Sequence, residues 1–193
     1  MHLSVITATR QRPAFLVHVL QQFQSQVCTG LRCEHLVVSD GPDPQARFLS
    51  GRWGARYFEL DRPFGHAGAF AKDRGIQAAT GEYVAFWDDD NLYAPEALSL
   101  LWNAACGADI GVVRTRHRLR KRTGIAILPR RWDGTFRPGD IDTMCVCVRR
   151  ELAQQECWGD HQPGPGTDIR WLQKLARHAP VIHYVPSVIG MHL

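Results

Sequence analysis

The stretch GEYVAFWDDDNLYAP, residues 81–95, decides the fold and raises the question of function. Its apolar run YVAFW has the composition of a strand that is buried on both faces, as in the centre of a parallel sheet. Asp88, Asp89 and Asp90 follow it directly. If the strand geometry continues, the carboxylates of Asp88 and Asp90 lie ~6–7 Å apart. They would then repel each other by about 2–3 kcal/mol at an effective dielectric constant of ~20.

A divalent cation would turn this repulsion into attraction. Carboxylate oxygens are hard ligands that select Mg²⁺ or Mn²⁺, and Mg²⁺ in proteins is commonly held by one or two carboxylates together with substrate phosphates. The alternative is a solvated loop whose aspartates cap the helix that Pro95 begins. The buried strand before the triplet favours the metal–phosphate site.

Composition narrows the class of protein. The chain has 193 residues, a formal net charge of +4, 45% hydrophobic and 22% charged residues, which predicts one globular domain rather than a disordered chain. The mild positive charge suits an anionic ligand and predicts no nucleic-acid partner. No apolar run is long enough for a transmembrane helix, and the start MHLSVITATRQRP lacks the features of a signal peptide.

The six cysteines form no C-x-x-C pair, and their spacing disfavours a zinc site. Free thiols are typical of a reducing compartment, so the sequence predicts a cytoplasmic protein.

Strand-like and helix-like segments alternate in the first half, which indicates βαβ units and a parallel sheet with helices on both faces. The predicted strands are LSVITA (3–8), EHLVVSD (34–40), ARYFEL (55–60) and YVAFW (83–87), and the predicted helices are PAFLVHVLQQFQSQ (13–26), AGAFAKDRGIQAAT (67–80) and PEALSLLWNAAC (95–106). The segment GPDP, residues 41–44, has turn chemistry.

The second half has a mixed character. We expect two extended segments joined by a basic turn, a strand running into a helix, an amphipathic helix and a last strand, in IGVVRTRHRLRKRTGIAILPRR (110–131), IDTMCVCVRRELAQQ (141–155), TDIRWLQKLARH (167–178) and VIHYVP (181–186). The predicted fold is a single Rossmann-like α/β domain over residues 1–193, with a mostly parallel central sheet between two helical layers and a mixed C-terminal portion.

Polar residues follow three of the predicted strands. Thr7, Thr9 and Arg10 stand at the end of the first, Asp40 at the end of the second, and the aspartate triplet at the end of the fourth. Ligands of open α/β sheets bind beyond the carboxyl ends of the strands. If these strands are parallel neighbours, the polar groups converge on one crevice.

At this point the sequence resembles the family 2 nucleotide-sugar glycosyltransferases of the GT-A fold, over about residues 3 to 192. The resemblance rests on the order and spacing of LSVITATRQRPAFLVHVLQQFQSQ (3–26), HLVVSDGPDP (35–44), GHAGAFAKDRGIQAATGEYVAFWDDDNLYAPEAL (65–98), IDTMCVCVRRELA (141–153) and GTDIRWLQKL (166–175). It implies a nucleotide-binding half over residues 1–95 and an acceptor-side half over residues 96–193.

The resemblance implies nucleotide-binding roles for several residues. Asp40 matches the aspartate that hydrogen-bonds the base, usually uracil; the alternative is an Asx-turn before Gly41. Ala8, Thr9 and Arg10 match the turn that contacts the nucleoside, although the family often has an aromatic residue where Arg10 stands. Lys72 falls where the family often has an arginine and would contact phosphate; the alternative is an exposed helix lysine.

The resemblance also implies a D-x-D-type metal motif. Asp90 is then the first choice as ligand to Mn²⁺ or Mg²⁺, and Asp88 and Asp89 contact ribose or metal-bound water. Because DDDN permits two registers, Asp88 is a second candidate ligand. His192 is a further candidate by analogy with the late histidine ligand of some GT-A enzymes; the alternative is a frayed terminus.

The implied reaction needs a base that takes the proton of the attacking hydroxyl. Asp168 matches the acidic residue at the start of the family's catalytic helix; the alternative is an N-cap residue. The family commonly has Glu-Asp where this chain has Thr167 and Asp168. Asp142 and Asp160 are the fallback bases.

Three features near the acceptor side carry further expectations. The Gly- and Pro-rich loop of residues 158–167 could close over the acceptor, and Trp158 is the tryptophan best placed to stack on a sugar. The basic run of residues 114–122 suits a phosphorylated acceptor or an anionic membrane surface, or is simply a solvated hairpin tip.

The expected function is therefore inverting, metal-dependent transfer of a sugar from a nucleotide diphosphate sugar, with UDP the expected nucleotide, to an acceptor hydroxyl. A saccharide, a lipid-linked molecule and a small molecule all remain open as acceptor, and so do peripheral membrane contact and a homo-oligomer. Two alternatives remain: a nucleotidyltransferase, although TATRQRP (7–13) lacks the glycines of a phosphate-binding loop, and a GT-A domain that binds nucleotide without catalysis.

Overall fold

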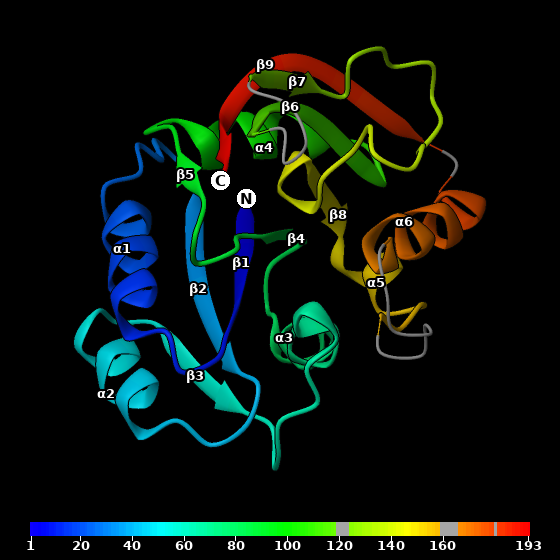
Figure 1. Cartoon of the computed structure of the whole chain (residues 1–193). Coiled ribbons are helices and arrows are strands. Elements are labelled where there is room, and N and C mark those ends of the chain that lie inside the picture. The colour runs from blue at the N-terminus through cyan, green and yellow to red at the C-terminus, as the bar shows by residue number, and fades with distance from the viewer. Residues whose placement is uncertain (119–123, 159–165, 180) are drawn as a thin grey trace.

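A computed structural model shows the arrangement of the chain (Figure 1) and describes residues 1–118, 124–158, 166–179 and 181–193. Its described strands form one sheet in the order β3-β2-β1-β4-β8-β6-β9-β5, with β7 paired to β6. The sheet lies between two layers of helices, as predicted.

The first half of the chain builds the parallel part of the sheet. Its elements are β1 (His2–Thr9), α1 (Pro13–Gln24), β2 (Arg32–Ser39), α2 (Pro44–Arg52), β3 (Arg56–Glu59), η1 (His66–Gly68), α3 (Ala69–Ala78) and β4 (Tyr83–Phe86). Strand β1 pairs in parallel with both β2 and β4, and β2 pairs in parallel with β3. The carboxyl ends of β1, β2 and β4 therefore meet at one edge of the sheet.

The second half adds the mixed part. Its elements are β5 (Leu92–Tyr93), α4 (Ala97–Ala105), β6 (Ile110–Arg118), β7 (Ile125–Leu128), η2 (Thr143–Cys145), β8 (Val146–Arg149), α5 (Arg150–Ala153), α6 (Thr167–His178) and β9 (Ile182–His192). Strand β8 runs antiparallel between β4 and β6, whereas β9 runs parallel to β6. Strands β6 and β7 form the antiparallel pair expected for two extended segments joined by a turn.

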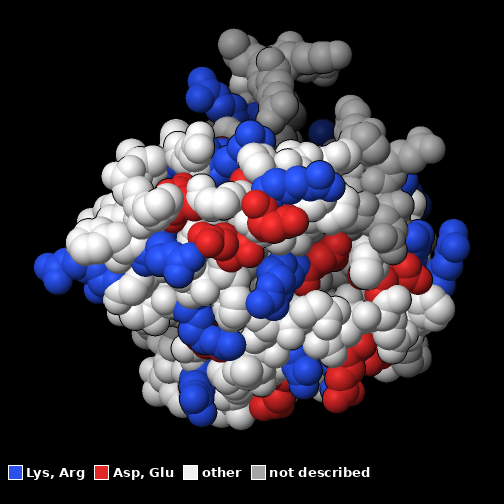
Figure 2. Space-filling model, turned by 90° about the horizontal axis from the view of Figure 1, so that it is seen from below, with Lys and Arg blue, Asp and Glu red and all other residues white. Residues whose placement is uncertain are grey.

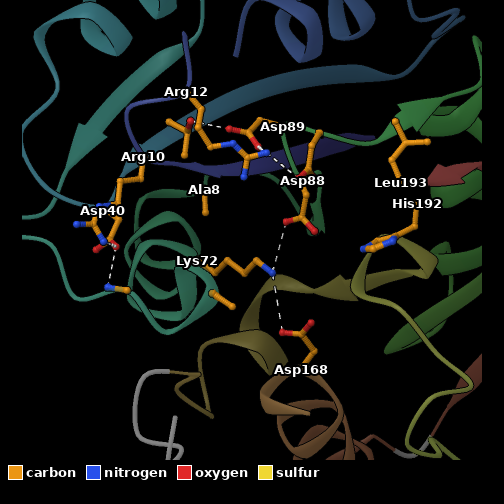
Figure 3. A pocket seen from close by; sticks show the side chains of 15 residues that line it. Ala8, Arg10, Arg12, Asp40, Lys72, Asp88, Asp89, Asp168, His192 and Leu193 are labelled. Carbon is orange, nitrogen blue, oxygen red and sulfur yellow. Dashed lines mark hydrogen bonds and ion pairs between the residues drawn. The ribbon is translucent and has the colours of Figure 1, made fainter. Parts of the chain in front are cut away.

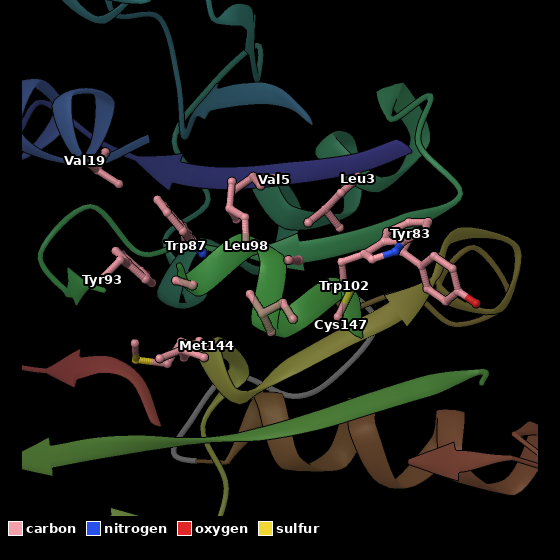
Figure 4. Close-up of a cluster of buried hydrophobic side chains, with 14 of the residues drawn as sticks. Leu3, Val5, Val19, Tyr83, Trp87, Tyr93, Leu98, Trp102, Met144 and Cys147 are labelled. Atoms are coloured by element: carbon pink, nitrogen blue, oxygen red, sulfur yellow. The ribbon is translucent and has the colours of Figure 1, made fainter. Parts of the chain in front are cut away.

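Side chains alternate between the two faces of the sheet, because successive residues of a strand point in opposite directions. On β4, Tyr83 and Ala85 join the apolar cluster under α1 and α4, while Val84 and Phe86 join the cluster under α3 and α6. Figure 4 shows the first of these clusters. There Trp87 stacks on the ring of Tyr93 with ring centroids 3.8 Å apart, which fixes the chain on both sides of the aspartate triplet.

Two segments differ from the expectation from sequence. GPDP was expected to be a turn, and the helix α2 that follows Asp43 was not predicted: the Asp43 carboxylate accepts a hydrogen bond from the amide of Ala46 at 2.9 Å, and Pro44 occupies the first turn of the helix. The last strand continues beyond Pro186 to His192, since β9 pairs with both β6 and β5.

Candidate active site

A pocket of about 580 Å³ opens where β1, β2 and β4 end (Figure 3). The predicted convergence of three polar strand ends is confirmed, since all three strands are parallel neighbours and all three ends line this pocket. Thr7 is the exception: it is buried, and its hydroxyl lies 2.9 Å from Nε2 of His35. The residues that line the pocket are Ala8, Thr9, Arg10, Arg12, Asp40, Gly65, Ala67, Gly68, Lys72, Asp88, Asp89, Asp90, Asp168, His192 and Leu193. The ten site residues predicted from sequence are therefore brought together in one place.

The aspartate triplet lies beyond the end of β4, and Asp89 and Asp90 lie in a turn, so the strand geometry does not continue through the triplet. Asp89 is buried, with a side chain 3% exposed; it accepts a hydrogen bond from Thr9 Oγ1 at 2.7 Å and pairs with the guanidinium of Arg12 at 2.9 Å. The same guanidinium pairs with Asp90 at 2.6 Å. Burial raises the pKa of Asp89 to about 6, against the opposing effects of Thr9 and Arg12.

Arg12 is a site residue that the sequence analysis missed. Its position in the polar turn TATRQRP, opposite an acidic triplet, was the available signal. Because this one cation pairs with two carboxylates, the repulsion expected within the triplet is partly relieved by the protein itself. Asp88 is left as the triplet member that faces Lys72.

Lys72 occupies the centre of the site. Its ammonium lies 3.6 Å from a carboxylate oxygen of Asp88 and 3.9 Å from one of Asp168, and Figure 3 shows it between the two. It also lies 4.9 Å from the ring centroid of Trp158. Burial alone would lower the pKa of Lys72, but the charges of Asp88, Asp168 and Asp142 outweigh burial and raise it. The alternative of an exposed helix lysine is wrong, because the Lys72 side chain is only 4% exposed.

Asp40 connects the end of β2 to the segment before α3. Its two carboxylate oxygens accept hydrogen bonds from the amides of Phe64 at 2.7 Å and Gly65 at 2.8 Å, and Arg10 lies 3.9 Å away. These contacts span more than twenty residues of sequence, so Asp40 organises the pocket wall rather than only its own turn.

A glycine lets α3 approach the end of β1. Gly68 has a φ of +75°, and a Cβ atom at this position would lie 2.8 Å from the Cβ of Ala8. A larger residue would therefore close this side of the pocket.

Asp168 stands in the first turn of α6, on the side of the pocket opposite the triplet. The N-cap of this helix is Gly166, and within the described part of the chain no side chain caps it, so the alternative of Asp168 as an N-cap is wrong. The Asp168 side chain is 45% exposed and available to a ligand. Of the fallback bases, Asp142 caps η2 through Met144 N at 3.0 Å, and Asp160 lies outside the described residues.

His192 is held within β9 and is not frayed. It stands opposite His117 of β6 in the strand register, and the two rings stack with centroids 4.3 Å apart and an interplanar angle of 3°. The ring of His192 also lies 3.6 Å from a carboxylate oxygen of Asp142. His117, Asp142 and His192 form a group of potential metal ligands whose donor atoms all lie within 4.8 Å of one another.

The expectation for Trp158 is wrong. Its side chain is fully buried, where it stacks on Trp171 at 3.9 Å and meets the edge of Phe86 at 4.6 Å. It therefore backs the pocket behind Lys72 and cannot stack on an acceptor. Most of the loop of residues 158–167 and the tip of the basic run, 119–123, lie outside the described residues.

The surface around the site carries charges of both signs. On the face shown in Figure 2, acidic and basic side chains are interspersed. Within the described residues, no helix is long and apolar enough to cross a membrane.

Several solved structures share this architecture. TarS 1–349 of S. aureus in complex with UDP aligns with a TM-score of 0.74 and 15% identity, over 100% of this chain and 60% of that one. The mannosyltransferase PcManGT of Pyrobaculum calidifontis, in complex with GDP-Man and Mn²⁺, aligns with a TM-score of 0.69 and 18% identity, over 98% of this chain and 56% of that one.

Glucosyl-3-phosphoglycerate synthase of Mycobacterium tuberculosis, in complex with Mn²⁺, UDP and glucosyl-3-phosphoglycerate, aligns with a TM-score of 0.65 and 17% identity, over 100% of this chain and 72% of that one. The chain thus spans about 60% of the length of the TarS structure. These similarities confirm the predicted GT-A fold.

A search of curated proteins finds none that matches. The model of the family described as Glycosyl transferase family 2 matches residues 4–152, which include the polar turn after β1, Asp40, Lys72 and the aspartate triplet. The chain therefore belongs to glycosyl transferase family 2.

Proposed function

We propose that this protein transfers a sugar from a nucleotide diphosphate sugar, with UDP as the nucleotide, to an acceptor hydroxyl, with inversion at the anomeric carbon and with a divalent metal ion. One observation carries the proposal: a single pocket at the carboxyl ends of β1, β2 and β4 holds Asp40, the aspartate triplet, Lys72 and Asp168 together. Family membership and the UDP held by the similar TarS structure support it.

The nucleotide would occupy the part of the pocket between β1 and α3. Asp40 would accept a hydrogen bond from the base, since each carboxylate oxygen has a second lone pair beyond the one used by a backbone amide. Ala8 and Thr9 would contact the nucleoside. Arg10 is about half exposed, so its guanidinium can reach phosphate, as can the ammonium of Lys72.

The side chains present fit a divalent cation. Asp88 is 33% exposed and its carboxylate faces the pocket, and the His192 ring points into the same space in Figure 3. A carboxylate and an imidazole are suitable ligands for Mn²⁺. Asp88, Asp90 and His192 remain the ligands proposed from sequence, although Arg12 already engages Asp90. When bound, the cation would supply charge neutralisation for the departing diphosphate.

Asp168 is the proposed base. Its partly exposed carboxylate faces the pocket from the side opposite the triplet, so an acceptor hydroxyl bound beside it would approach the sugar away from the leaving group. Attack from that direction inverts the anomeric configuration. Lys72, 3.9 Å away, fixes the orientation of this carboxylate.

Calorimetric titration of the protein with UDP, with and without Mn²⁺, tests the donor site, and a panel of nucleotide sugars then tests turnover by slow donor hydrolysis. We expect Mn²⁺-dependent UDP binding that is weakened at least about tenfold by Asp40→Asn, which loses a charge-assisted hydrogen bond. Asp133→Asn is the matched control, because Asp133 pairs with Arg137 outside the pocket.

The alternatives give different results in the same experiments. UDP binding with no turnover of any donor would identify a silent binding domain. Release of pyrophosphate from a nucleoside triphosphate would instead identify a nucleotidyltransferase. Absence of UDP binding under all conditions would refute the proposal.

A further inference from the structure

One face of the β6–β7 pair carries basic and apolar side chains together. Residues that lie directly opposite each other in an antiparallel pair point to the same face of the sheet. The register pairs Arg116 with Ile127 and Arg118 with Ile125. All four residues are exposed, Ile125 at 56% and Ile127 at 42%. An antiparallel sheet normally presents polar side chains on its solvated face, so two exposed isoleucines between arginines call for an explanation.

The opposite face of the same strands is already buried. The alternate register pair, Thr115 and Leu128, lies on that face, and both residues are buried. Val113 of β6 and Ile189 of β9 join the apolar cluster under α1 and α4. The strands therefore have their packed face, and the two isoleucines are surplus to it.

The exposed face continues across two further strands. Arg116 is the register partner of Met191 on β9, and Met191 is in turn the partner of Leu92 on β5. Met191 is partly exposed and Leu92 is 39% exposed. Figure 1 shows β6, β7 and β9 together at the top of the molecule. We call this surface the outer face; its residues are Leu92, Arg116, Arg118, Ile125, Ile127 and Met191.

The charge of the outer face has one sign. Strands β5, β6, β7 and β9 contain no aspartate or glutamate. Among the described residues, no carboxylate forms an ion pair with Arg116 or Arg118. The exposed Arg47 of α2, by comparison, lies 2.7 Å from Glu59. The guanidinium groups of the outer face are thus left for a partner from outside the chain.

These charges decide between the occupants that such a face could have. A two-fold interface uses the same patch on both copies, so a second copy of the chain would bring arginines against arginines. Like charges placed together in this way oppose association. A free phosphate group would engage the arginines but would leave the isoleucines in water. An anionic surface with an apolar interior satisfies both kinds of side chain.

We infer that the outer face docks on a membrane that contains anionic lipids. Guanidinium groups form charge-assisted hydrogen bonds with lipid phosphates, and basic residues are attracted to the negative potential of such a surface. The isoleucines enter the boundary between headgroups and acyl chains, where apolar side chains are removed from water. This docking goes beyond the proposed function and uses residues outside the pocket lining.

Docking has a consequence for the acceptor, and this consequence rests on the proposed function. His192 directly follows Met191 in β9 and lines the pocket, so the pocket adjoins the outer face. A membrane held at the outer face therefore lies beside the pocket. Of the three acceptors left open, a lipid-linked molecule in the same membrane is the one we expect.

Co-sedimentation of the full chain with lipid vesicles tests the inference. The vesicles contain equal parts of phosphatidylcholine and phosphatidylglycerol, and vesicles of phosphatidylcholine alone are the reference. We expect binding to the anionic vesicles only, weakened by added salt through screening. Arg116→Gln/Arg118→Gln should weaken binding on the order of twentyfold, because each basic residue near such a surface contributes about fivefold. Ile125→Ser/Ile127→Ser should weaken binding about tenfold, because less apolar surface leaves water.

Arg47→Gln/Arg52→Gln is the matched control. It removes the same charge from exposed positions of α2, which lies beside β3 at the other end of the strand order. This control should bind the anionic vesicles as the original protein does. Equal loss in the two arginine variants, equal binding to both kinds of vesicle, or no vesicle binding by the original protein overturns the inference.

Two further measurements identify the other occupants. Full vesicle binding by the folded isoleucine variant would reduce the outer face to a phosphate site and overturn the inference, with folding checked by circular dichroism. A dimer in sedimentation velocity that the same variant dissociates would assign the face to a second copy and also overturn it. UDP titration separates the two proposals: the arginine variant should lose vesicle binding and keep UDP binding, whereas vesicle binding without binding of UDP or any nucleotide sugar refutes only the proposed function.

Discussion

Replacing Lys72 by methionine should destabilise the protein by about 2 kcal/mol. At 3.6 Å from Asp88 and an effective dielectric constant of ~20, the charge attraction is about 4–5 kcal/mol. Removing one partner of a fully buried pair costs about 3–5 kcal/mol. The expected loss is smaller here, because Asp88 and Asp168 are partly exposed and water can solvate them once the ammonium is gone.

Urea unfolding followed by tryptophan fluorescence at pH 7.5 measures this loss. The pKa of Lys72 is raised in the folded protein, so its stabilising contribution is fully present below the ordinary lysine pKa of 10.5 and disappears only at higher pH. An assay at pH 7.5 therefore records all of it. A double-mutant cycle with Asp88→Asn should give a coupling energy of at least about 1 kcal/mol.

Lys174 provides the matched control for this experiment. It is also a helix lysine in an ion pair, 3.5 Å from Glu156, but its side chain is much more exposed than that of Lys72. Exposed pairs of this kind contribute about 0–1 kcal/mol. If Lys174→Met and Lys72→Met cost the same stability, or if the cycle shows no coupling, the reasoning that a buried ammonium holds the pocket carboxylates is refuted.

Three further predictions follow from other parts of the pocket. Asp89→Asn should raise the free energy of unfolding by about 2–3 kcal/mol at pH 7.5 and by almost nothing at pH 4. Burial raises the pKa of Asp89 from 3.8 to about 6 in the folded protein, so the ionised carboxylate costs stability as the pH rises through this window. Equal effects of the substitution at both pH values, measured by chemical denaturation, would contradict this. Asp168→Asn should leave UDP affinity within about twofold while lowering transfer 10²–10⁴-fold, as for loss of a general base; near-normal transfer rates would exclude Asp168 from that role. Gly68→Ala should lower the free energy of unfolding by about 2 kcal/mol, measured by thermal unfolding, and weaken UDP binding, because it adds a steric contact to the strain of a positive φ. The control Gly54→Ala, with a φ of +71° and no atom near the added Cβ, should lower it by only about 1 kcal/mol and leave UDP binding unchanged. Identical behaviour of the two variants would contradict the proposed contact.

The parallel half of the fold could be predicted from sequence because its signals are local. The run before the aspartate triplet is apolar on both faces, and β4 is buried on both faces. Polar residues after three parallel strands were enough to place Asp40 and the triplet in one pocket. The position of each strand end is a property that such patterns carry, whereas the order of the strands in the sheet came only from the structure.

The missed features depend on contacts between distant segments. The division of the triplet into two carboxylates held by Arg12 and one that faces Lys72 depends on how a turn after β1 meets a turn after β4. Burial of Lys72 depends on Trp158, more than eighty residues later. No local pattern distinguishes such a lysine from an exposed one, because its environment is supplied by other elements.

The balance of charge in the pocket has a consequence for the order of ligand association. Five aspartates line it against two arginines and one lysine, which leaves two negative charges when His192 is neutral. A free nucleoside diphosphate, itself an anion, is repelled by such a surface. Association should therefore be fast for the cation-complexed nucleotide and slow for the bare one, and added monovalent salt should narrow the difference between the two rates by screening.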